Sequence, residues 1–290
     1  MTNVQQMIRQ TARQKQVRQD IVEKDYAISY LMASLATISP LSDMLVMKGG
    51  TALKKLYFGE YRFSEDLDYS TRESARIPPI VFDKYIDQVV NDLVNQLNKR
   101  GPFQVVWETL KLKHPHPGGQ QAYVVRIQFP GQRYPMCRLK VEITVDEPIL
   151  APISYCRIQH DYALEEFSVK VPSYSLKEIT AEKLRTLLQV RIRLQTRGWG
   201  ASRICRDYYD LWHLLRTDVI KKDETLIPLL KEKCAVRDVS FESPLDFITD
   251  NLRAVAVAEW DQQLLPFVPT APGALLVLSE VEQALQEYDW

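Results

Sequence analysis

The stretch MKGGTALKKLYFGEYRFSEDLDYS, residues 47–70, constrains the fold and chemistry of this chain more than any other segment. It follows a short apolar run, turns at a glycine pair, and ends in two aspartates that one residue separates. A glycine turn between a strand and a helix suits an anion, whereas paired carboxylates suit a cation. The segment therefore predicts one site that holds both kinds of ion.

The glycine pair has the pattern of a phosphate-binding turn. It follows the apolar residues 44–47, an expected strand, and it precedes an expected helix that begins near Thr51. Without Cβ atoms, Gly49 and Gly50 let backbone N–H groups approach a phosphate closely, and the start of the helix adds partial positive charge. The segment also offers a hydroxyl donor and three possible countercharges, which are Thr51, Lys48, Lys54 and Lys55.

Asp66 and Asp68 have the spacing of a cation-binding pair. On an expected strand over residues 62–70, both side chains leave the same face, with Cα atoms about 6.5–7 Å apart. Two like charges held this close repel unless a cation lies between them, and Mg²⁺ is commonly held by one or two carboxylates plus substrate phosphates. An exposed turn or helix cap is the alternative for an isolated pair. The preceding glycine turn favours the metal site.

A third carboxylate is expected on a neighbouring strand, as in nucleotidyltransferases of the polymerase-β type. The segment RLKVEITVD, residues 138–146, places Glu142 between two apolar residues. We expect Glu142 to be the third metal ligand or the base that takes a proton from an attacking hydroxyl, with Asp146 as the other candidate. A half-exposed strand with a polar outer face would explain the same pattern.

The composition excludes several other classes of protein. Lys plus Arg equals Asp plus Glu at 37 each, so any polyanion site must come from local clustering. The four cysteines have no CxxC spacing, which favours neither a zinc site nor a disulfide framework. No apolar run approaches the roughly 20 residues that span a bilayer. We therefore expect a cytoplasmic protein without a membrane segment.

The pattern of elements predicts an α+β fold in two domains. Residues 20–38 and 83–101 have helical periodicity, whereas residues 103–110, 121–129 and 137–146 have the pattern of strands. After Pro172 nearly every segment has a helical pattern. We therefore expect a mixed domain over residues 1–172 and an α-helical domain over residues 173–290.

The helical half carries a local excess of positive charge. From Lys183 to Arg206 there are seven basic residues and no acid, after which RDYYDLWHL places Asp207 and Asp210 on one helix face. The basic block would neutralise a triphosphate and an RNA backbone, although a solvated helix face is the alternative. The two aspartates could pair with Lys183 as structure, orient it for catalysis, or act as base.

Several motifs, taken in order, resemble the AbiEii/AbiGii toxin family, which are nucleotidyltransferase-like toxins of bacterial toxin–antitoxin and phage-defence systems. EKDY at residues 23–26 resembles the family's N-terminal signature. KGGTAL and RFSEDLD resemble its first and second motifs, and SLKEITAEKLRTLL with RDYYDL resemble the later ones. The family often has Ser where Thr51 stands, a change that keeps the hydroxyl.

The resemblance implies a polymerase-β-like nucleotidyltransferase lobe, a C-terminal α-helical lobe, and an active site in the cleft between them. Gly50 and Thr51 would hold nucleotide phosphates and the two aspartates of RFSEDLD would bind Mg²⁺, while Lys183 and Asp207 or Asp210 would complete the site. A nucleoside triphosphate would be the substrate, the 3′ end of a tRNA the expected acceptor, and a cognate antitoxin the partner. The alternatives are a kinase-like toxin that transfers a phosphoryl group, and a protein that binds nucleotide or a partner without turnover.

Overall fold

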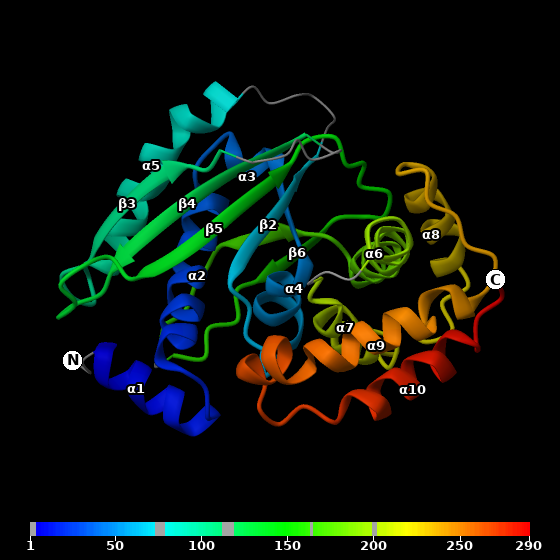
Figure 1. The fold of residues 1–290 in the computed structure, drawn as a ribbon. Coiled ribbons are helices and arrows are strands. Elements are labelled where there is room, and N and C mark those ends of the chain that lie inside the picture. The colour runs from blue at the N-terminus through cyan, green and yellow to red at the C-terminus, as the bar shows by residue number, and fades with distance from the viewer. Residues whose placement is uncertain (1–3, 73–78, 112–118, 163–164, 199–201) are drawn as a thin grey trace. The chain divides into compact units, whose positions relative to one another are not determined.

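The computed structural model describes residues 4–72, 79–111, 119–162, 165–198 and 202–290 (Figure 1). Internal contacts divide the chain into two compact units. Unit 1 comprises residues 1–149 and 153–174, and unit 2 comprises residues 150–152 and 175–290. The division of the chain into domains of residues 1–172 and 173–290 stays a prediction.

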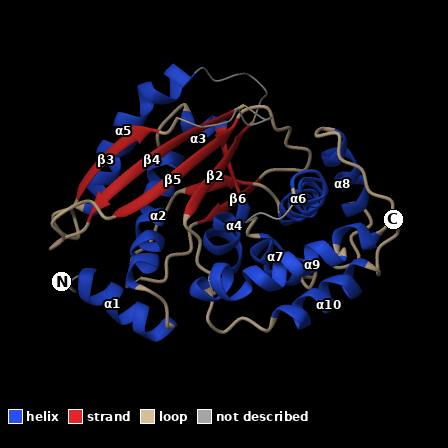
Figure 2. Cartoon of the chain, in the orientation of Figure 1, coloured by secondary structure: helices blue, strands red, loops and turns tan. Residues whose placement is uncertain are grey.

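Unit 1 is built on a mixed seven-stranded sheet in the order β3-β4-β5-β2-β1-β7-β6 (Figure 2). β1 pairs antiparallel with β2 and parallel with β7, while β2 and β5 run parallel. The remaining pairs, β3 with β4, β4 with β5 and β6 with β7, are antiparallel. The strands are β1 Leu45–Lys48, β2 Asp66–Thr71, β3 Gln104–Thr109, β4 Gln120–Gln128, β5 Cys137–Thr144, β6 Ser154–Arg157 and β7 Lys170–Ser173.

The helices of unit 1 cover one face of this sheet. α2 packs against α5, β5 and β7, and α5 packs against β3, while α1 lies on α2 (Figure 1). Because α2 has neighbours on several sides, all of residues 25–35 are buried. The helices are α1 Val4–Lys15, α2 Gln19–Thr37, α3 Leu41–Met44, α4 Gly49–Ala52, the π-helix η1 Leu53–Phe58 and α5 Pro79–Leu97.

Alternation along the central strands separates a buried face from a polar face. In β2, buried Leu67 stands between Asp66 and Asp68, which are both half-buried. In β5, buried Val141 stands between Lys140 and Glu142 in the same way. Since side chains alternate across a strand, the charged residues of both strands share the face opposite Leu67 and Val141.

The α+β prediction is confirmed, and its boundaries differ in detail. The expected strand over residues 62–70 begins only at Asp66, because residues 62–65 form no ladder. The helix expected near Thr51 begins at Gly49 and continues as η1, and the helix expected at residues 83–101 spans Pro79–Leu97. Strand β6 was not expected. It joins the sheet by pairing antiparallel with β7, the next strand along the chain.

Unit 2 is helical in its described residues. α6 packs on α7, α8 and α9, α7 packs on α9, and α10 packs on α7 and α9. Ser175 caps α6 by accepting a hydrogen bond from the N–H of Glu178. The elements are α6 Leu176–Arg197, α7 Ile204–Leu214, α8 Leu226–Ala235, η2 Pro244–Phe247, α9 Asp250–Glu259, η3 Trp260–Leu264, η4 Leu265–Phe267 and α10 Ala274–Leu285.

A buried ion pair anchors unit 2. The ammonium of Lys233 lies 2.6 Å from a carboxylate oxygen of Glu178, and both side chains are fully buried. Glu178 also accepts hydrogen bonds from the backbone N–H groups of Leu150 and Ala151. These bonds explain why residues 150–152 cluster with unit 2.

None of the helices in the described part of the chain has the length and apolar character that crossing a bilayer requires.

Candidate active site

Three charged residues lie side by side on the polar face of the unit 1 sheet. Lys48 on β1 is the direct partner of Asp68 on β2, and Asp68 is in turn the direct partner of Glu142 on β5. Neighbouring strands lie about 4.8 Å apart, so the three side chains emerge as one row across the sheet. Asp66 occupies the same face of β2 one pleat away, opposite Lys140. The structure thus brings together the carboxylates that the sequence proposed as the metal site.

The glycine pair lies directly against this row. Gly49 has a φ of +76°, and a Cβ atom there would come within 2.9 Å of an Asp68 carboxylate oxygen. Gly50 packs against the buried guanidinium of Arg62, and a Cβ atom at Gly50 would lie 2.3 Å from its Nη2. Both positions therefore need glycine, the first for backbone conformation and close approach and the second for close approach alone.

Thr51 has a different contact from the one expected. Its side chain is buried, its hydroxyl donates to the backbone carbonyl of Asp66, and its Oγ1 lies 2.7 Å from Oγ of Ser64. The hydroxyl therefore ties the glycine turn to the first residue of β2. In this arrangement Thr51 holds the turn against the first residue of the aspartate pair, and the donors that the turn offers to an anion are the backbone N–H groups of the first helical turn.

The carboxyl cluster is electrostatically strained. Burial, and after it the neighbouring carboxylates of Glu142 and Asp66, raise the pKa of Asp68 to about 7 against the smaller opposing effects of Lys48 and Lys140. A carboxyl group whose charge is disfavoured in this way gains from any cation that enters the site. A carboxyl group with a pKa raised by burial and by like charges is a candidate for a functional site.

Glu142 has partners of its own. Its carboxylate lies 2.7 Å from the ammonium of Lys140 and accepts a hydrogen bond of 2.5 Å from the side-chain amide of Gln120. Among the described residues, no group of three or more His, Cys, Asp and Glu side chains is arranged to hold a metal ion. Since Mg²⁺ commonly takes one or two carboxylates and completes its shell with phosphates and water, Asp66 and Asp68 alone fit the ion chemically.

The EKDY segment on α2 anchors the surroundings of the site. Lys24 pairs with Glu65, the residue before β2, at 2.7 Å. Asp25 forms a buried ion pair of 2.6 Å with Lys55 on η1, the π-helix that follows the glycine turn, and accepts a hydrogen bond from Tyr162. The Lys55 ammonium lowers the pKa of Asp25 despite burial of that carboxyl. These contacts hold α2 against both the start of β2 and the helix behind the turn.

Two other candidates of unit 1 lie in different surroundings. The ammonium of Lys54 donates to the carbonyl of Gly59 and lies 3.1 Å from a carboxylate oxygen of Asp161. Asp146 is the second residue after the end of β5 and packs against Gly119. We therefore leave Lys54 and Asp146 out of the proposed site.

Unit 2 contains a second charged cluster. The ammonium of Lys183 on α6 lies 2.8 Å from Asp207 and 2.6 Å from Asp210, which are both on α7. Asp210 is fully buried, and Lys183 is nearly so. The structure thus brings together the lysine and both aspartates that the sequence proposed, in one cluster with two carboxylates around one ammonium.

The basic block around this cluster is partly used inside unit 2. Arg185 donates to the carbonyl of Lys233, and Arg191 donates to Asp246 and to the carbonyl of Ser240. Arg206 donates to the carbonyl of Gln263 and stacks on the ring of Phe267, 4.0 Å from its centroid. The cationic surface is therefore smaller than the run of basic residues suggested.

Sequence reasoning missed Arg62 and Lys140. Arg62 is buried against Gly50, and Lys140 pairs with Glu142, so both place positive charge beside the glycine turn or the carboxylates. Both stand in segments that the sequence analysis singled out, RFSEDLD and RLKVEITVD. The available signal for Arg62 was a basic residue at the start of the segment that carries the aspartate pair.

Comparison with known proteins decides the family. The profile of the family described as "Nucleotidyl transferase AbiEii toxin, Type IV TA system" matches residues 30–287. The chain belongs to this family. The family assignment and the nucleotidyltransferase prediction made from the motifs are therefore confirmed, and membership implies a nucleoside triphosphate substrate and an antitoxin partner.

The fold agrees with that of a solved structure. MenT4, a nucleotidyltransferase toxin from Mycobacterium tuberculosis H37Rv, matches with a TM-score of 0.62 at 20% sequence identity, covering 98% of this chain and 90% of that one. An antigenic nucleotidyltransferase-like protein from Paracoccidioides brasiliensis matches with a TM-score of 0.38 at 15% identity, covering 78% of this chain and 98% of that one. No curated protein matches the sequence.

Proposed function

We propose that this AbiEii-family protein transfers a nucleotidyl group from a nucleoside triphosphate to an RNA 3′-hydroxyl, with the 3′ end of a tRNA as acceptor, and thereby inhibits growth. The single observation that supports the proposal most strongly is the row of Lys48, Asp68 and Glu142 beside the turn at Gly49. It combines donors for a triphosphate with the carboxylate of Asp68, whose charge is disfavoured by burial and by the two neighbouring carboxylates.

In this proposal Asp66 and Asp68 hold Mg²⁺. Bound there, the ion would neutralise triphosphate charge and polarise the α-phosphate. The backbone N–H groups that follow Gly49 bind phosphate oxygens, and the ammonium of Lys48 adds a positive charge beside Asp68. Glu142, next to Asp68 on β5, takes the proton of the attacking hydroxyl.

The Lys183 cluster of unit 2 is proposed to take part in the same reaction. Its ammonium neutralises charge on the leaving pyrophosphate, while Asp207 and Asp210 orient it. Because Asp210 is fully buried, Lys183→Met would leave a buried carboxylate without its ion-pair partner, which costs stability as well as activity. Lys183→Arg keeps the charge and tests whether the ammonium itself is needed.

The decisive experiment is incubation with total tRNA, Mg²⁺ and each nucleoside triphosphate labelled in turn at the α- and γ-phosphates, followed by sequencing of the RNA 3′ ends. We expect α-label on RNA 3′ ends with wild-type protein and none with Asp68→Asn. The matched control is Asp43→Asn, which removes the same charge from an exposed position on α3. Transfer of γ-label to protein would support a kinase-like toxin, and nucleotide binding with no labelled product would support binding without turnover. Wild-type labelling by Asp68→Asn would refute the assignment of the site.

A further inference from the structure

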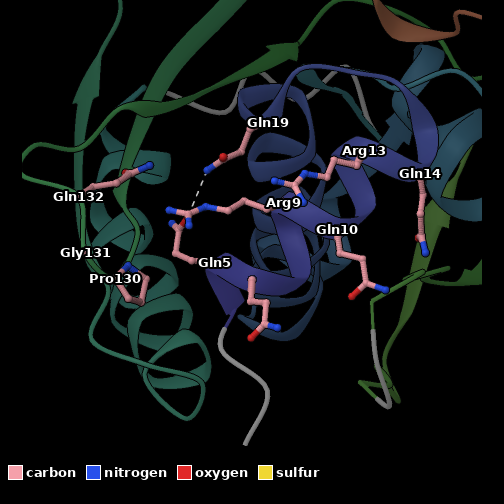
Figure 3. Close-up of a pocket in the computed structure, with 10 residues that line it drawn as sticks. Gln5, Arg9, Gln10, Arg13, Gln14, Gln19, Pro130, Gly131 and Gln132 are labelled. Atoms are coloured by element: carbon pink, nitrogen blue, oxygen red, sulfur yellow. Dashed lines mark hydrogen bonds between the residues drawn. The ribbon is translucent and has the colours of Figure 1, made fainter.

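A second charged feature of unit 1 lies on α1, far along the chain from the motifs of the active site. α1, the N-terminus of α2 and the turn after β4 enclose a hollow of about 910 Å³, shown in Figure 3. We call it the α1 groove. Six of its ten lining residues are glutamines, two are Arg9 and Arg13, and none is acidic. Arg9 extends from α1 towards the turn that carries Gln132 (Figure 3).

The α1 groove has a net positive charge. Arg9 and Arg13 are exposed, and in the part of the chain that the structure describes neither has a carboxylate within ion-pair distance. Two of the nearby acids have cationic partners, and the third is hydrogen-bonded to neutral amides. Asp20 pairs with Arg18, Glu60 pairs with Lys15, and Glu23 accepts hydrogen bonds from the amides of Gln19 and Gln132.

This lining fits a polyanion better than a small organic ligand. Small-molecule pockets are lined mainly by hydrophobic and aromatic side chains, whereas the only apolar lining residue of the α1 groove is Pro130. Arginine guanidinium groups match phosphate oxygens with two parallel hydrogen bonds. Glutamine amides carry both donors and acceptors, so they suit the phosphates, hydroxyls and base edges of a nucleic acid strand.

An exposed aromatic residue follows the groove's lining residues closely in sequence. Tyr134 follows the lining residue Gln132 by two positions and is 74% exposed, next to the exposed residues Arg133 and Met136. Proteins that bind single-stranded nucleic acid commonly combine exposed aromatic rings with a basic groove. The bases stack on the rings, and the phosphate backbone lies along the positive charge.

We propose that the α1 groove binds the backbone of a single-stranded segment of the acceptor RNA, with Tyr134 stacking a base at its edge. The inference rests on the proposed function, since it assigns the surface that holds that reaction's acceptor. The family profile matches only from residue 30, so α1 and both of its groove arginines lie outside it. The groove offers a means of acceptor choice outside the region that the profile matches.

The test measures binding of a fluorescein-labelled single-stranded RNA of about 16 nucleotides by anisotropy, without nucleotide, over about 50–200 mM salt. The variant is Arg9→Gln/Arg13→Gln, which keeps good helix formers on an exposed helix. The logarithm of the association constant falls as the logarithm of the salt concentration rises, and losing two phosphate contacts makes this slope less steep by about 1.4. At 0.1 M salt the loss corresponds to a Kd about 25-fold higher. The control Arg157→Gln/Lys170→Gln removes two exposed charges from the β6–β7 edge and should change Kd less than about twofold.

Tyr134 provides an independent variant on another element. Tyr134→Ala should raise Kd by about 5-fold or more, and Tyr134→Phe should restore it because the ring is retained. Equal Kd values for wild type and the double arginine variant would overturn the proposal. The proposal would also be overturned if poly-L-glutamate bound as tightly as the RNA and lost the same affinity in the same variants. The groove would then be a site for an acidic protein.

Failure of this inference and failure of the proposed function give different results. Asp68→Asn leaves the α1 groove unchanged and should bind the RNA with wild-type affinity. If wild-type protein binds RNA through the groove but labels none, the inference stands and the proposed transfer reaction fails. If RNA is labelled with equal efficiency by wild type and Arg9→Gln/Arg13→Gln, the reaction stands and the groove is not its acceptor site.

Discussion

Asp68→Asn should make the metal-free protein more stable above neutral pH while it removes the activity. In the folded protein the pKa of Asp68 rises from 3.8 to about 7, chiefly because of burial and secondarily because of Glu142 and Asp66. The folded state therefore keeps a proton that the unfolded chain has already lost. The contribution of the Asp68 carboxyl group to the free energy of unfolding is fully present below about pH 4 and is lost as the pH rises through about 7.

The size of the effect follows from the same shift. Subtracting 3.8 from about 7 leaves about 3 pKa units, and each unit corresponds to about 1.4 kcal/mol, which gives an upper value of about 4 kcal/mol. Asp68 is half-buried, so solvent screening reduces this value, and we expect about 2–4 kcal/mol at pH 8. Asn has nearly the shape of Asp and no charge, so the substitution removes the penalty without opening a cavity.

Urea denaturation in the presence of a chelator measures this prediction at about pH 8 and about pH 4.5. The gain in unfolding free energy should be large at the higher pH and fall to about 1 kcal/mol or less at the lower one. The control Asp43→Asn should stay within about 0.5 kcal/mol of wild type at both. Added Mg²⁺ should stabilise wild type more than Asp68→Asn. A variant no more stable than wild type at pH 8, or equally stabilised at both pH values, would refute the argument that the cluster is strained.

Two further substitutions test the framework of the site. Gly50→Ala should lower the free energy of unfolding by about 1–3 kcal/mol in thermal or urea unfolding, because the new methyl displaces the buried guanidinium of Arg62; Gly273→Ala, with open space around it, should not. Lys55→Met should cost about 3–5 kcal/mol by leaving Asp25 buried without its partner. Lys55→Met/Asp25→Leu should recover most of that loss, and a double variant as unstable as the single one would contradict this account.

The local elements of the site could be read from the sequence because they depend on short-range geometry. A spacing of two residues on a strand places Asp66 and Asp68 on one face wherever the strand lies in the sheet. The same alternation placed Glu142 opposite buried Val141. The direct pairing of Asp68 with Glu142 required only that β2 and β5 be neighbours in this register, which the structure provides.

The remaining features depend on contacts between distant parts of the chain. The hydroxyl of Thr51 is engaged with Ser64 and Asp66, and the ammonium of Lys54 is engaged with Gly59 and Asp161. No local pattern distinguishes such a side chain from one that points at a ligand. Strand β6 and the parallel pairing of β1 with β7 were missed for the same reason, since both depend on where the chain returns.

The EKDY segment shows how a motif can mark a function without taking part in the chemistry. Its lysine pairs with Glu65 before β2, and its aspartate pairs with Lys55 behind the glycine turn. A cluster of like charges such as Asp66, Asp68 and Glu142 repels itself, so it persists only where the surrounding backbone is held in place. The buried pair and the α2 contacts supply that restraint. A substitution in EKDY should therefore reduce activity by loosening the site rather than by removing a group that touches the nucleotide.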